Sequence, residues 1–409
     1  MTKPAVLYLY DDARARAFEP FALTRPASEL RFGAELGRRR WERALGGAAA
    51  GFVGAQHLDG FAEPGAPPLA SGVIPAGAVV ANSRFAPRLG AEAAGPSVWR
   101  ANGRVAALRL TAPLDADTLR DGATTLDELA SGRGDEATIE GWWADEVWHL
   151  LRDLQAQLAD DIPRIAATLD CDRAPSTTVL GAQGVYVERG AVLEPLVVLD
   201  ASAGPVLVRR GATVQAFTRL VGPCYVGENA TIAGDRVSGC SIGEMAKVRG
   251  DISASVVLGH ANKGHDGFVG HSYLGRWVNL GAGTTTSNLK NTYGSVAIAT
   301  PTGLRDTGMQ FLGTLFGDHA KTGIGMRLTT GSVIGAGANV YGSTMPGKVV
   351  PPFAWGDCAP YGSFGFEKFI VVAERVMARR HVELDSGMRR MLAAAFERRA
   401  IAALDGSHR

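Results

Sequence analysis

A lysine and a histidine stand two residues apart in the segment Asn262 to Phe268. Six-residue repeats precede and follow this segment, so we predict that it is a loop expelled from a regular coil. An ammonium group can hold an anion, and a histidine with a pKa near neutral can accept a proton. Lys263 and His265 on such a loop therefore predict a small-molecule site. Of the reactions that use a base and a cation, acyl transfer fits this pair best.

Other interpretations of this histidine stay open. A single histidine in a loop is more often a solvated residue than a base. His260 and His271 lie in the same stretch of sequence and are the neighbours most easily confused with His265.

A second set of polar residues follows the first apolar run, which covers residues 5–10. Asp11 and Asp12 come directly after this run, and ligands of open α/β sheets bind at the carboxyl ends of the strands. We predict that Asp11 or Asp12 binds Mg²⁺ and that Arg25 and Arg31 contact phosphates. In the alternative, Asp11 only caps a turn and Arg25 packs on the domain surface.

Apolar residues recur at every sixth position over much of the chain. The period appears in Val208, Val214, Leu220, Val226 and Ile232, and again in Phe316, Thr322, Leu328, Ile334 and Val340. Six fits neither an amphipathic helix nor a plain alternating strand. It predicts a β-helix of roughly eight to ten coils, in which each coil needs its neighbours for stability. A sandwich of short strands does not explain so regular a period.

The first part of the chain has a different pattern, with apolar runs and helical segments in alternation. Strands are expected at residues 5–10, 51–53 and 79–82, and helices at residues 35–45 and 148–159. This alternation predicts an open, largely parallel α/β sheet.

We therefore expect three parts, at residues 1–175, 176–362 and 363–409. Residues 174–178, which include Pro175, are predicted to form the hinge between the first two. Residues 364–403 are predicted to form a helical tail that covers the open end of the β-helix.

Composition excludes several classes of protein. The formal net charge is +1 over 409 residues, which argues against a nucleic-acid partner. The four cysteines show no metal-binding spacing and are expected to be reduced core residues of a cytosolic protein. No apolar run is long enough to span a membrane, and no signal peptide is expected.

Two stretches resemble a known family. They are the segment from Asn262 to Asn291, which includes LGAGTTTSNLKN, and the segment from Leu7 to Gly33, which includes LTRPASELRFG. Both are similar to a bacterial sugar nucleotidyltransferase-like branch of the bifunctional enzymes that make UDP-N-acetylglucosamine. The resemblance implies a truncated Rossmann-like nucleotidyltransferase domain and a left-handed parallel β-helix that transfers an acyl group. It also implies a cytoplasmic homotrimer with the acyl site between subunits.

The resemblance also implies roles for individual residues. His265 would be the base, Asn279 would hold the reacting groups, and acetyl-CoA or another acyl-CoA would be the co-substrate. The amino-sugar phosphate would be bound by Arg249, Lys263, Phe268, Asn288 and Lys290, and coenzyme A by Ala282, Lys321, Arg327 and Ala336. In the front domain, Asn82, Arg25 and Arg31 would bind a nucleoside triphosphate and a sugar 1-phosphate. Asp11 and Asp12 would hold the Mg²⁺ ion.

The sequence departs from the family pattern in both parts. No glycine lies between Thr2 and Arg31, and Asn82 stands where the family has an aspartate that binds metal. Leu289 and Lys290 follow Asn288 where the family has Tyr-Asp-Gly, so the acceptor need not be glucosamine 1-phosphate. Three hypotheses result: a fused nucleotidyltransferase and acyltransferase, an acyltransferase with an inactive front domain, and a non-catalytic subunit of a nucleotidyltransferase.

Overall fold

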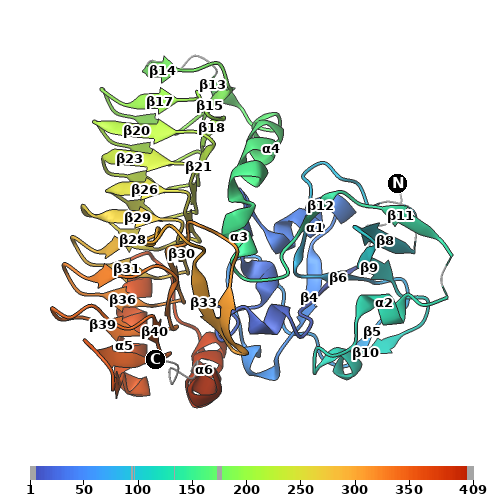
Figure 1. Cartoon of the computed structure of the whole chain (residues 1–409). Helices are drawn as coiled ribbons and strands as arrows, with labels where there is room; N and C mark the ends of the chain where they lie inside the picture. The colour runs from blue at the N-terminus through green and yellow to red at the C-terminus, as the bar shows by residue number, and fades with distance from the viewer. Residues whose placement is uncertain (1–5, 94, 96, 133, 173–176, 403–409) are drawn as a thin grey trace. The chain divides into compact units, whose positions relative to one another are not determined.

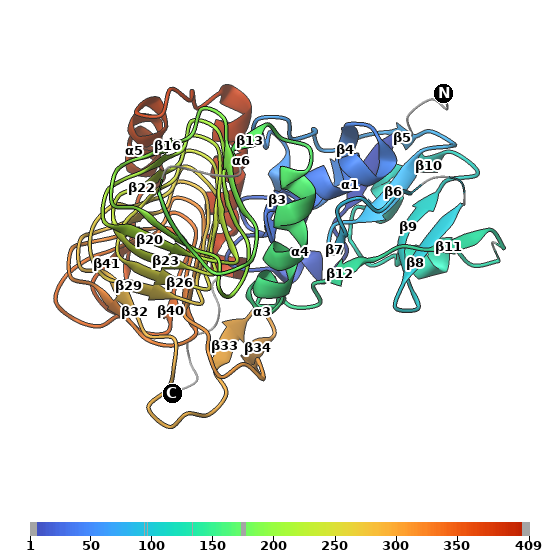
Figure 2. The same cartoon turned by 90° about the horizontal axis from the view of Figure 1, so that it is seen from above.

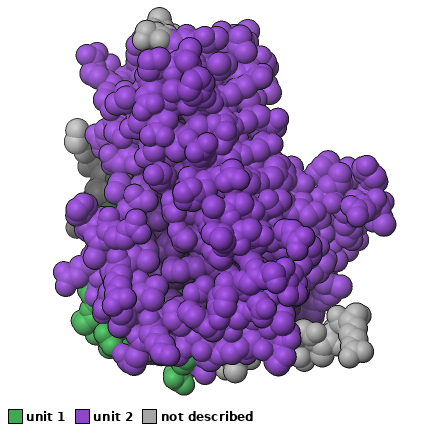
Figure 3. Space-filling model, turned by 90° about the vertical axis from the view of Figure 1, so that its left-hand side faces the viewer, with its two compact units in different colours: residues 1–18, 22–149, 385–397 green, residues 19–21, 150–384, 398–409 purple. Residues whose placement is uncertain are grey.

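The computed structural model describes residues 6–93, 95, 97–132, 134–172 and 177–402 of the chain. It divides into two units (Figure 3). Unit 1 comprises residues 1–18, 22–149 and 385–397, and unit 2 comprises residues 19–21, 150–384 and 398–409. Residues 174–176 of the predicted hinge lie outside the described residues. The chain passes from unit 1 to unit 2 between His149 and Leu150, before the predicted boundary at residue 175. The reason is that α4 (Leu154–Ala166) packs on strands of unit 2.

Unit 1 is built on a six-stranded sheet in the order β11-β8-β9-β6-β1-β4. Its strands are β1 (Leu7–Tyr10), β4 (Ala49–Val53), β6 (Val79–Asn82), β8 (Val98–Ala101), β9 (Arg104–Arg109) and β11 (Glu136–Thr138). Smaller strands are β2 (Arg31–Phe32), β3 (Glu35–Leu36), β5 (Val73–Ile74), β7 (Phe85–Pro87), β10 (Leu114–Asp115) and β12 (Gly141–Trp143). The helices are α1 (Gly37–Leu45), α2 (Leu126–Leu129) and the start of α3 (His149–Arg152).

The α/β class predicted for this part is confirmed, but the sheet is less parallel than expected. β1 pairs in parallel with β4 and with β6, whereas β9 runs antiparallel to both β6 and β8. The reason is the short connection from Ala101 to Arg104, which can join only antiparallel strands. The strands expected at residues 51–53 and 79–82 are present as β4 and β6.

Unit 2 contains the predicted parallel β-helix of about ten turns, in which three sheets form the walls (Figures 1 and 2). The first wall has β13 (Cys171–Asp172), β15 (Val185–Glu188), β18 (Val206–Val208), β21 (Cys224–Val226), β24 (Ser241–Ile242), β27 (Val256–Val257), β30 (Tyr273–Leu274), β35 (Thr314–Phe316), β38 (Ser332–Ile334) and β40 (Val349–Val350). The second has β14 (Thr178–Leu180), β17 (Val198–Asp200), β20 (Thr218–Val221), β23 (Asp235–Ser238), β26 (Asp251–Ser253) and β29 (Phe268–Gly270), followed by β32 (Thr285–Thr286) and β37 (Arg327–Leu328).

The third wall has β16 (Val192–Leu193), β19 (Thr213–Val214), β22 (Thr231–Ile232), β25 (Lys247–Val248), β28 (Asn262–Lys263), β31 (Asn279–Leu280), β36 (Lys321–Thr322), β39 (Asn339–Val340), β41 (Ala354–Gly356) and β42 (Gly362–Ser363). A hairpin of β33 (Ala297–Thr300) and β34 (Gly303–Asp306) leaves the coils.

The core of the β-helix explains the six-residue period. Register partners along the first wall point inward and stack in one buried apolar cluster: Val208, Val226, Ile242, Val257, Leu274, Phe316, Ile334 and Val350. Each coil contributes one such residue per wall, so every coil covers the apolar surface of the next.

The predicted tail is helical, with α5 (Phe366–Ala378) and α6 (Ser386–Ala402). The Phe369 ring of α5 contacts Phe353 at 4.9 Å and His319 at 5.6 Å between ring centroids, so α5 packs along a corner of the last coils. Residues 385–397, by contrast, group with unit 1. The tail therefore does not act as a single cover over the end of the β-helix.

Two expectations from composition are also tested. No helix among the described residues is long and apolar enough to cross a membrane. All four cysteines are free, and Cys224 and Cys240 are buried in the core as expected. Cys358 is exposed and Cys171 is half-buried, so the expectation of a core position is wrong for these two.

Candidate active site on the β-helix

The segment Asn262 to Phe268 is not an expelled loop. Asn262 pairs with Lys247 of the preceding coil and Phe268 pairs with Asp251, so the residues between β28 and β29 form an ordinary corner. Lys263 occupies the inward position that Val248 fills one coil earlier. A lysine at an apolar position interrupts the hexapeptide pattern, which is why the sequence falsely indicates a loop.

Lys263 is buried, with 1% of its surface exposed. Its amine donates hydrogen bonds to the carbonyl oxygens of His265 at 2.6 Å and Asp266 at 2.7 Å, and burial lowers its pKa to about 8. The side chain thus ties the corner from inside, and the expectation that it faces a sugar phosphate is contradicted. His265 is exposed on the outside of the same corner, and Arg249 is paired with Asp235 at 3.2 Å.

The real insertion begins one coil later. Asn279 of β31 pairs with Lys321 of β36, and the chain between β32 and β35 leaves the coils to form the β33–β34 hairpin. The neck of this insertion is a bridge between Leu289 and Phe311. The backbone N–H of Leu312 donates to the Asn288 carbonyl at 2.9 Å, which closes the neck.

His271 lies at this neck. Its Nδ1 is 2.8 Å from the Asn288 side-chain amide, and its ring stacks on Phe311 with centroids 5.2 Å apart and planes 23° apart. The Gly313 N–H donates to the His271 carbonyl at 2.9 Å. Burial lowers the pKa of His271, which favours the neutral form of the imidazole.

The contact between His271 and Asn288 sets the histidine tautomer. As placed, the Asn288 Nδ2 is the atom 2.8 Å from Nδ1; with Nδ2 donating, Nδ1 accepts and Nε2 carries the hydrogen. The orientation of an asparagine amide is assigned from its hydrogen bonds. With the amide oxygen and nitrogen exchanged, the oxygen accepts from Nδ1–H, and Nε2 keeps the lone pair that can accept a proton. An oriented, neutral imidazole is the arrangement that general-base catalysis requires.

Two predicted substrate residues do meet at this point. A side chain at Gly270 would collide with both the Asn288 amide and the Phe268 ring, so both lie beside the residue that precedes His271. Sequence reasoning named Phe268 and Asn288 but assigned the base to His265. The missed signal was the position of Asn288 at the end of the last regular coil before the insertion.

His260, the other neighbouring histidine, belongs to a different cluster. Its Nδ1 is 2.8 Å from Arg276, whose other guanidinium nitrogen is paired with Glu244 at 2.5 Å. Its ring lies 4.5 Å from that of Trp277. His260 is therefore held in a packed ion-pair network.

One residue predicted to hold the reacting groups lies beside one predicted to bind coenzyme A. Asn279 and Lys321 are register partners on the third wall, and Asn279 also accepts a hydrogen bond from Asn262 at 2.7 Å. Burial lowers the pKa of Lys321 to about 8. Arg327 lies on β37 of the second wall, Ala336 is 1% exposed and Ala282 is half-buried, and the binding of coenzyme A by these residues stays a prediction.

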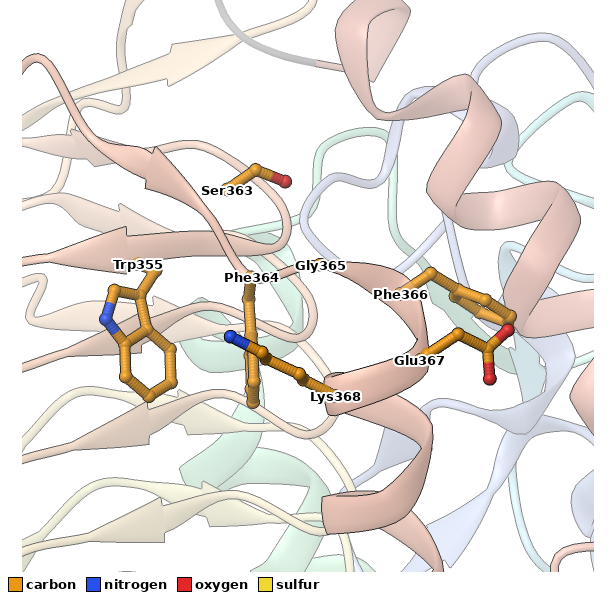
Figure 4. Close-up of a pocket in the computed structure, with 7 residues that line it drawn as sticks. All are labelled: Trp355, Ser363, Phe364, Gly365, Phe366, Glu367 and Lys368. Atoms are coloured by element: carbon orange, nitrogen blue, oxygen red, sulfur yellow. The ribbon is translucent and has the colours of Figure 1, made fainter.

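One pocket in unit 2 contains no predicted site residue. It has a volume of about 600 Å³ and is lined by Trp355, Ser363, Phe364, Gly365, Phe366, Glu367 and Lys368. Figure 4 shows Trp355 at its left and Phe366 with Glu367 at its right. The pocket forms where β42 leads into α5, a tertiary arrangement that carries no sequence motif.

The predicted metal and phosphate site of unit 1 is closed by internal pairs. Arg84 binds Asp12 through Nη2 at 2.6 Å and Nε at 2.8 Å, and Asn82 donates to Asp12 at 2.9 Å. Arg84 also pairs with Asp145 at 2.8 Å. Desolvation is the largest single effect on Asp12 and raises its pKa, but the hydrogen bond and charge of Arg84, with the hydrogen bonds from Ala15 and Asn82, together outweigh it and lower the pKa.

The remaining predicted residues of unit 1 are also engaged. Asp11 accepts from the Ala27 N–H at 3.0 Å, and burial raises its pKa to about 6. Arg25 is 2% exposed and pairs with Glu63 at 2.8 Å, while Arg31 is 3% exposed and donates to the Ala34 carbonyl at 2.5 Å. Among the described residues, no group of three or more His, Cys, Asp or Glu could hold a metal ion. Mg²⁺ is commonly held by one or two carboxylates together with substrate phosphates, so its binding by Asp11 or Asp12 stays a prediction.

Comparison with known proteins finds a family model that matches the front of the chain. Residues 7–169 match the model of a family described as sugar nucleotidyl transferase, which confirms the resemblance inferred from the sequence. A bifunctional sugar-1-phosphate nucleotidylyltransferase/acetyltransferase of Sulfurisphaera tokodaii is 33% identical over 99 residues. That match covers 24% of this chain, and the chain spans about a quarter (24%) of the relative's length.

Solved structures similar to the chain include two of AntD, an N-acyltransferase from Bacillus cereus. A point mutant of AntD in complex with dTDP-4-amino-4,6-dideoxyglucose and coenzyme A is 10% identical with a TM-score of 0.19, over 50% of this chain and 86% of that one. The enzyme in complex with dTDP and 3-hydroxybutyryl-CoA is 12% identical with a TM-score of 0.17, over 54% and 95%. The fold of this chain is assigned from its own strand pairing.

Proposed function

We propose that the chain is a sugar-1-phosphate nucleotidyltransferase fused to an acyl-CoA-dependent N-acyltransferase that acts on an amino-sugar phosphate. The observation that carries the acyltransferase half is the His271–Asn288 contact at the neck of the insertion. The nucleotidyltransferase half is supported by the family match of residues 7–169. The name of the Sulfurisphaera tokodaii relative supports the combination of the two.

In the proposed reaction His271 is the base. The acceptor amine attacks the thioester carbonyl, a C–N bond forms, and the C–S bond breaks. The proton lost by the amine passes to Nε2 of His271 and then to the departing thiolate. This role requires the exchanged amide, in which the Asn288 oxygen accepts from Nδ1–H and orients the ring, while Phe311 covers one ring face. His265 is an alternative base, and its exposed position on a separate corner argues against it.

The acyltransferase half is tested by release of coenzyme A thiol from acetyl-CoA in the presence of glucosamine 1-phosphate. Thiol release that depends on the acceptor supports the proposal. If no amino-sugar phosphate stimulates thiol release, the β-helix does not carry this activity.

A second candidate for the front domain is favoured by its closed ion pairs. Because Asp12 and Arg25 are committed to Arg84 and Glu63, this domain would bind a nucleotide sugar without performing chemistry. Pyrophosphate release from a nucleoside triphosphate and a sugar 1-phosphate, measured with and without Mg²⁺, separates the two candidates. We also propose a homotrimer, which light scattering tests; an active monomer contradicts it.

A further inference from the structure

Two lysines meet on the insertion that follows Asn288. The Lys290 amine donates to the carbonyl of Ser295, and the Lys348 amine donates to the carbonyl of Ala297 at 3.3 Å. Alternate residues of an extended chain are about 7 Å apart and direct their carbonyls to the same side. The two ammonium groups therefore occupy neighbouring points along one edge of the segment that leads into β33.

These two charges are close enough to oppose each other. Burial lowers the pKa of Lys348, and the positive charge of Lys290 lowers it further. Within the described ranges of the chain, neither amine has a carboxylate within 4 Å. Two unpaired like charges in a half-buried position are unfavourable unless an anion joins them.

Asp306 is an acidic group that interacts electrostatically with Lys290. Its carboxylate accepts from the Gly308 N–H at 3.1 Å and from the Ser295 hydroxyl at 2.8 Å, and these hydrogen bonds, with a smaller effect of Lys290, lower its pKa. Asp306 is exposed and already engaged, so it does not neutralise both lysines.

The position of the pair relates it to the candidate active site. Lys290 comes two residues after Asn288 and directly after Leu289, which bridges to Phe311 at the neck. Lys348 comes from the segment before β40 and reaches the hairpin from the last coil. Residues far apart in the sequence thus place two cations on the element whose neck contacts His271.

We propose that Lys290 and Lys348 form an anion subsite that binds the phosphate of the acceptor whose amine reacts at His271. This proposal rests on the proposed acyltransferase function. Each lysine uses one of its three donors on a carbonyl and keeps two for phosphoryl oxygens. A phosphate bridging the two amines neutralises the repulsion, and it anchors the sugar away from the base.

Two acceptors share this chemistry: an amino-sugar 1-phosphate and an amino sugar linked to a nucleoside diphosphate. Titration calorimetry with glucosamine 1-phosphate, with UDP-glucosamine and with unphosphorylated glucosamine distinguishes them. We expect that one phosphorylated ligand binds at least tenfold more tightly than glucosamine. Equal binding of all three ligands overturns the proposal.

The lysine variants assign that preference to the subsite. Lys348→Gln and, separately, Lys290→Gln should each weaken binding of the preferred ligand roughly tenfold, since a charge-assisted hydrogen bond is lost. Lys348→Arg should keep most of the affinity. Lys247→Gln, which removes an exposed lysine from β25, is the matched control and should leave binding unchanged.

Binding separates this proposal from the proposed function. Loss of affinity in both glutamine variants, with unchanged unfolding temperatures, supports the subsite even if no acyl transfer is found. Acyl transfer with unchanged affinity in both variants overturns the subsite and leaves the proposed function in place. Ligand that binds to the front domain should bind equally to wild type and to every lysine variant. The difference in affinity between the variants therefore reports on the subsite alone.

Discussion

The β-helix neck and the strand ends of the front domain both gather polar side chains, but they use them differently. In the front domain Asp12, Arg84 and Asp145 satisfy one another, and so do Arg25 and Glu63. At the neck His271 has one oriented nitrogen, and Lys348 lacks a carboxylate partner among the described residues. Charges that pair internally hold elements together, whereas polar groups with unused capacity are available to a ligand.

The largest expected effect sharpens this comparison at the neck. His271→Ala should lower kcat/KM for acyl transfer by at least a hundredfold, because a general base contributes about 10²–10⁴-fold. His265→Ala, at an exposed corner, should change it by no more than about twofold. Burial lowers the pKa of His271. The wild-type rate should therefore rise with pH and reach its plateau at a lower pH than expected for an ordinary histidine with a pKa of about 6.5. A hundredfold loss in His265→Ala with an active His271→Ala enzyme would return the role of base to His265.

The next effect concerns stability of the front domain. Arg84→Met leaves the Asp12 carboxylate buried without its partner and should lower the free energy of unfolding by about 3 kcal/mol. Arg88→Met breaks the exposed pair with Glu140 and should cost no more than about 0.5 kcal/mol. Five of the seven tryptophans lie in residues 41–148, so denaturant unfolding followed by tryptophan fluorescence reports mainly on this domain. Similar costs for the two variants would mean that the Arg84 network is not structural.

A smaller effect tests whether Asp11 is a metal ligand or a buried acid. Burial raises its folded pKa to about 6, above the unfolded value of about 3.9, so its ionisation destabilises the fold as pH rises between these values. Asp11→Asn keeps an acceptor for the Ala27 N–H and removes this cost. The variant should be more stable than wild type by about 2 kcal/mol at pH 7.5 and equally stable near pH 4.

The control for Asp11 is magnesium. A buried acid outside a metal site predicts that millimolar Mg²⁺ leaves the unfolding midpoint of wild type unchanged. An increase in the wild-type midpoint that disappears in Asp11→Asn would instead restore the predicted metal role of this aspartate.

The sequence predicts the coils well because each coil repeats a local pattern. It fails at the insertion, because Lys263 at an inward position looks like an interruption, whereas apolar residues such as Val296 and Ile298 hide the true departure from the coils. In the front domain the strand ends were located correctly. The partners of Asp12 and Arg25 come from Arg84 and Glu63, which are distant in sequence, so no local pattern could show that these side chains were already paired.

The smallest expected effect asks how much of the His271 environment comes from the insertion. Phe311→Leu removes the stacked ring, whose interaction is worth about 1 kcal/mol, and should lower kcat roughly fivefold. It also exposes the imidazole to water, so the pKa of His271 should rise towards its usual value, as NMR titration of the ring protons would show. Tyr293→Leu removes an exposed aromatic ring from the same insertion and should change neither quantity. If Phe311→Leu leaves both the rate and the pKa unchanged, the insertion does not shape the base, and the neck differs from the front domain only in which charges are paired.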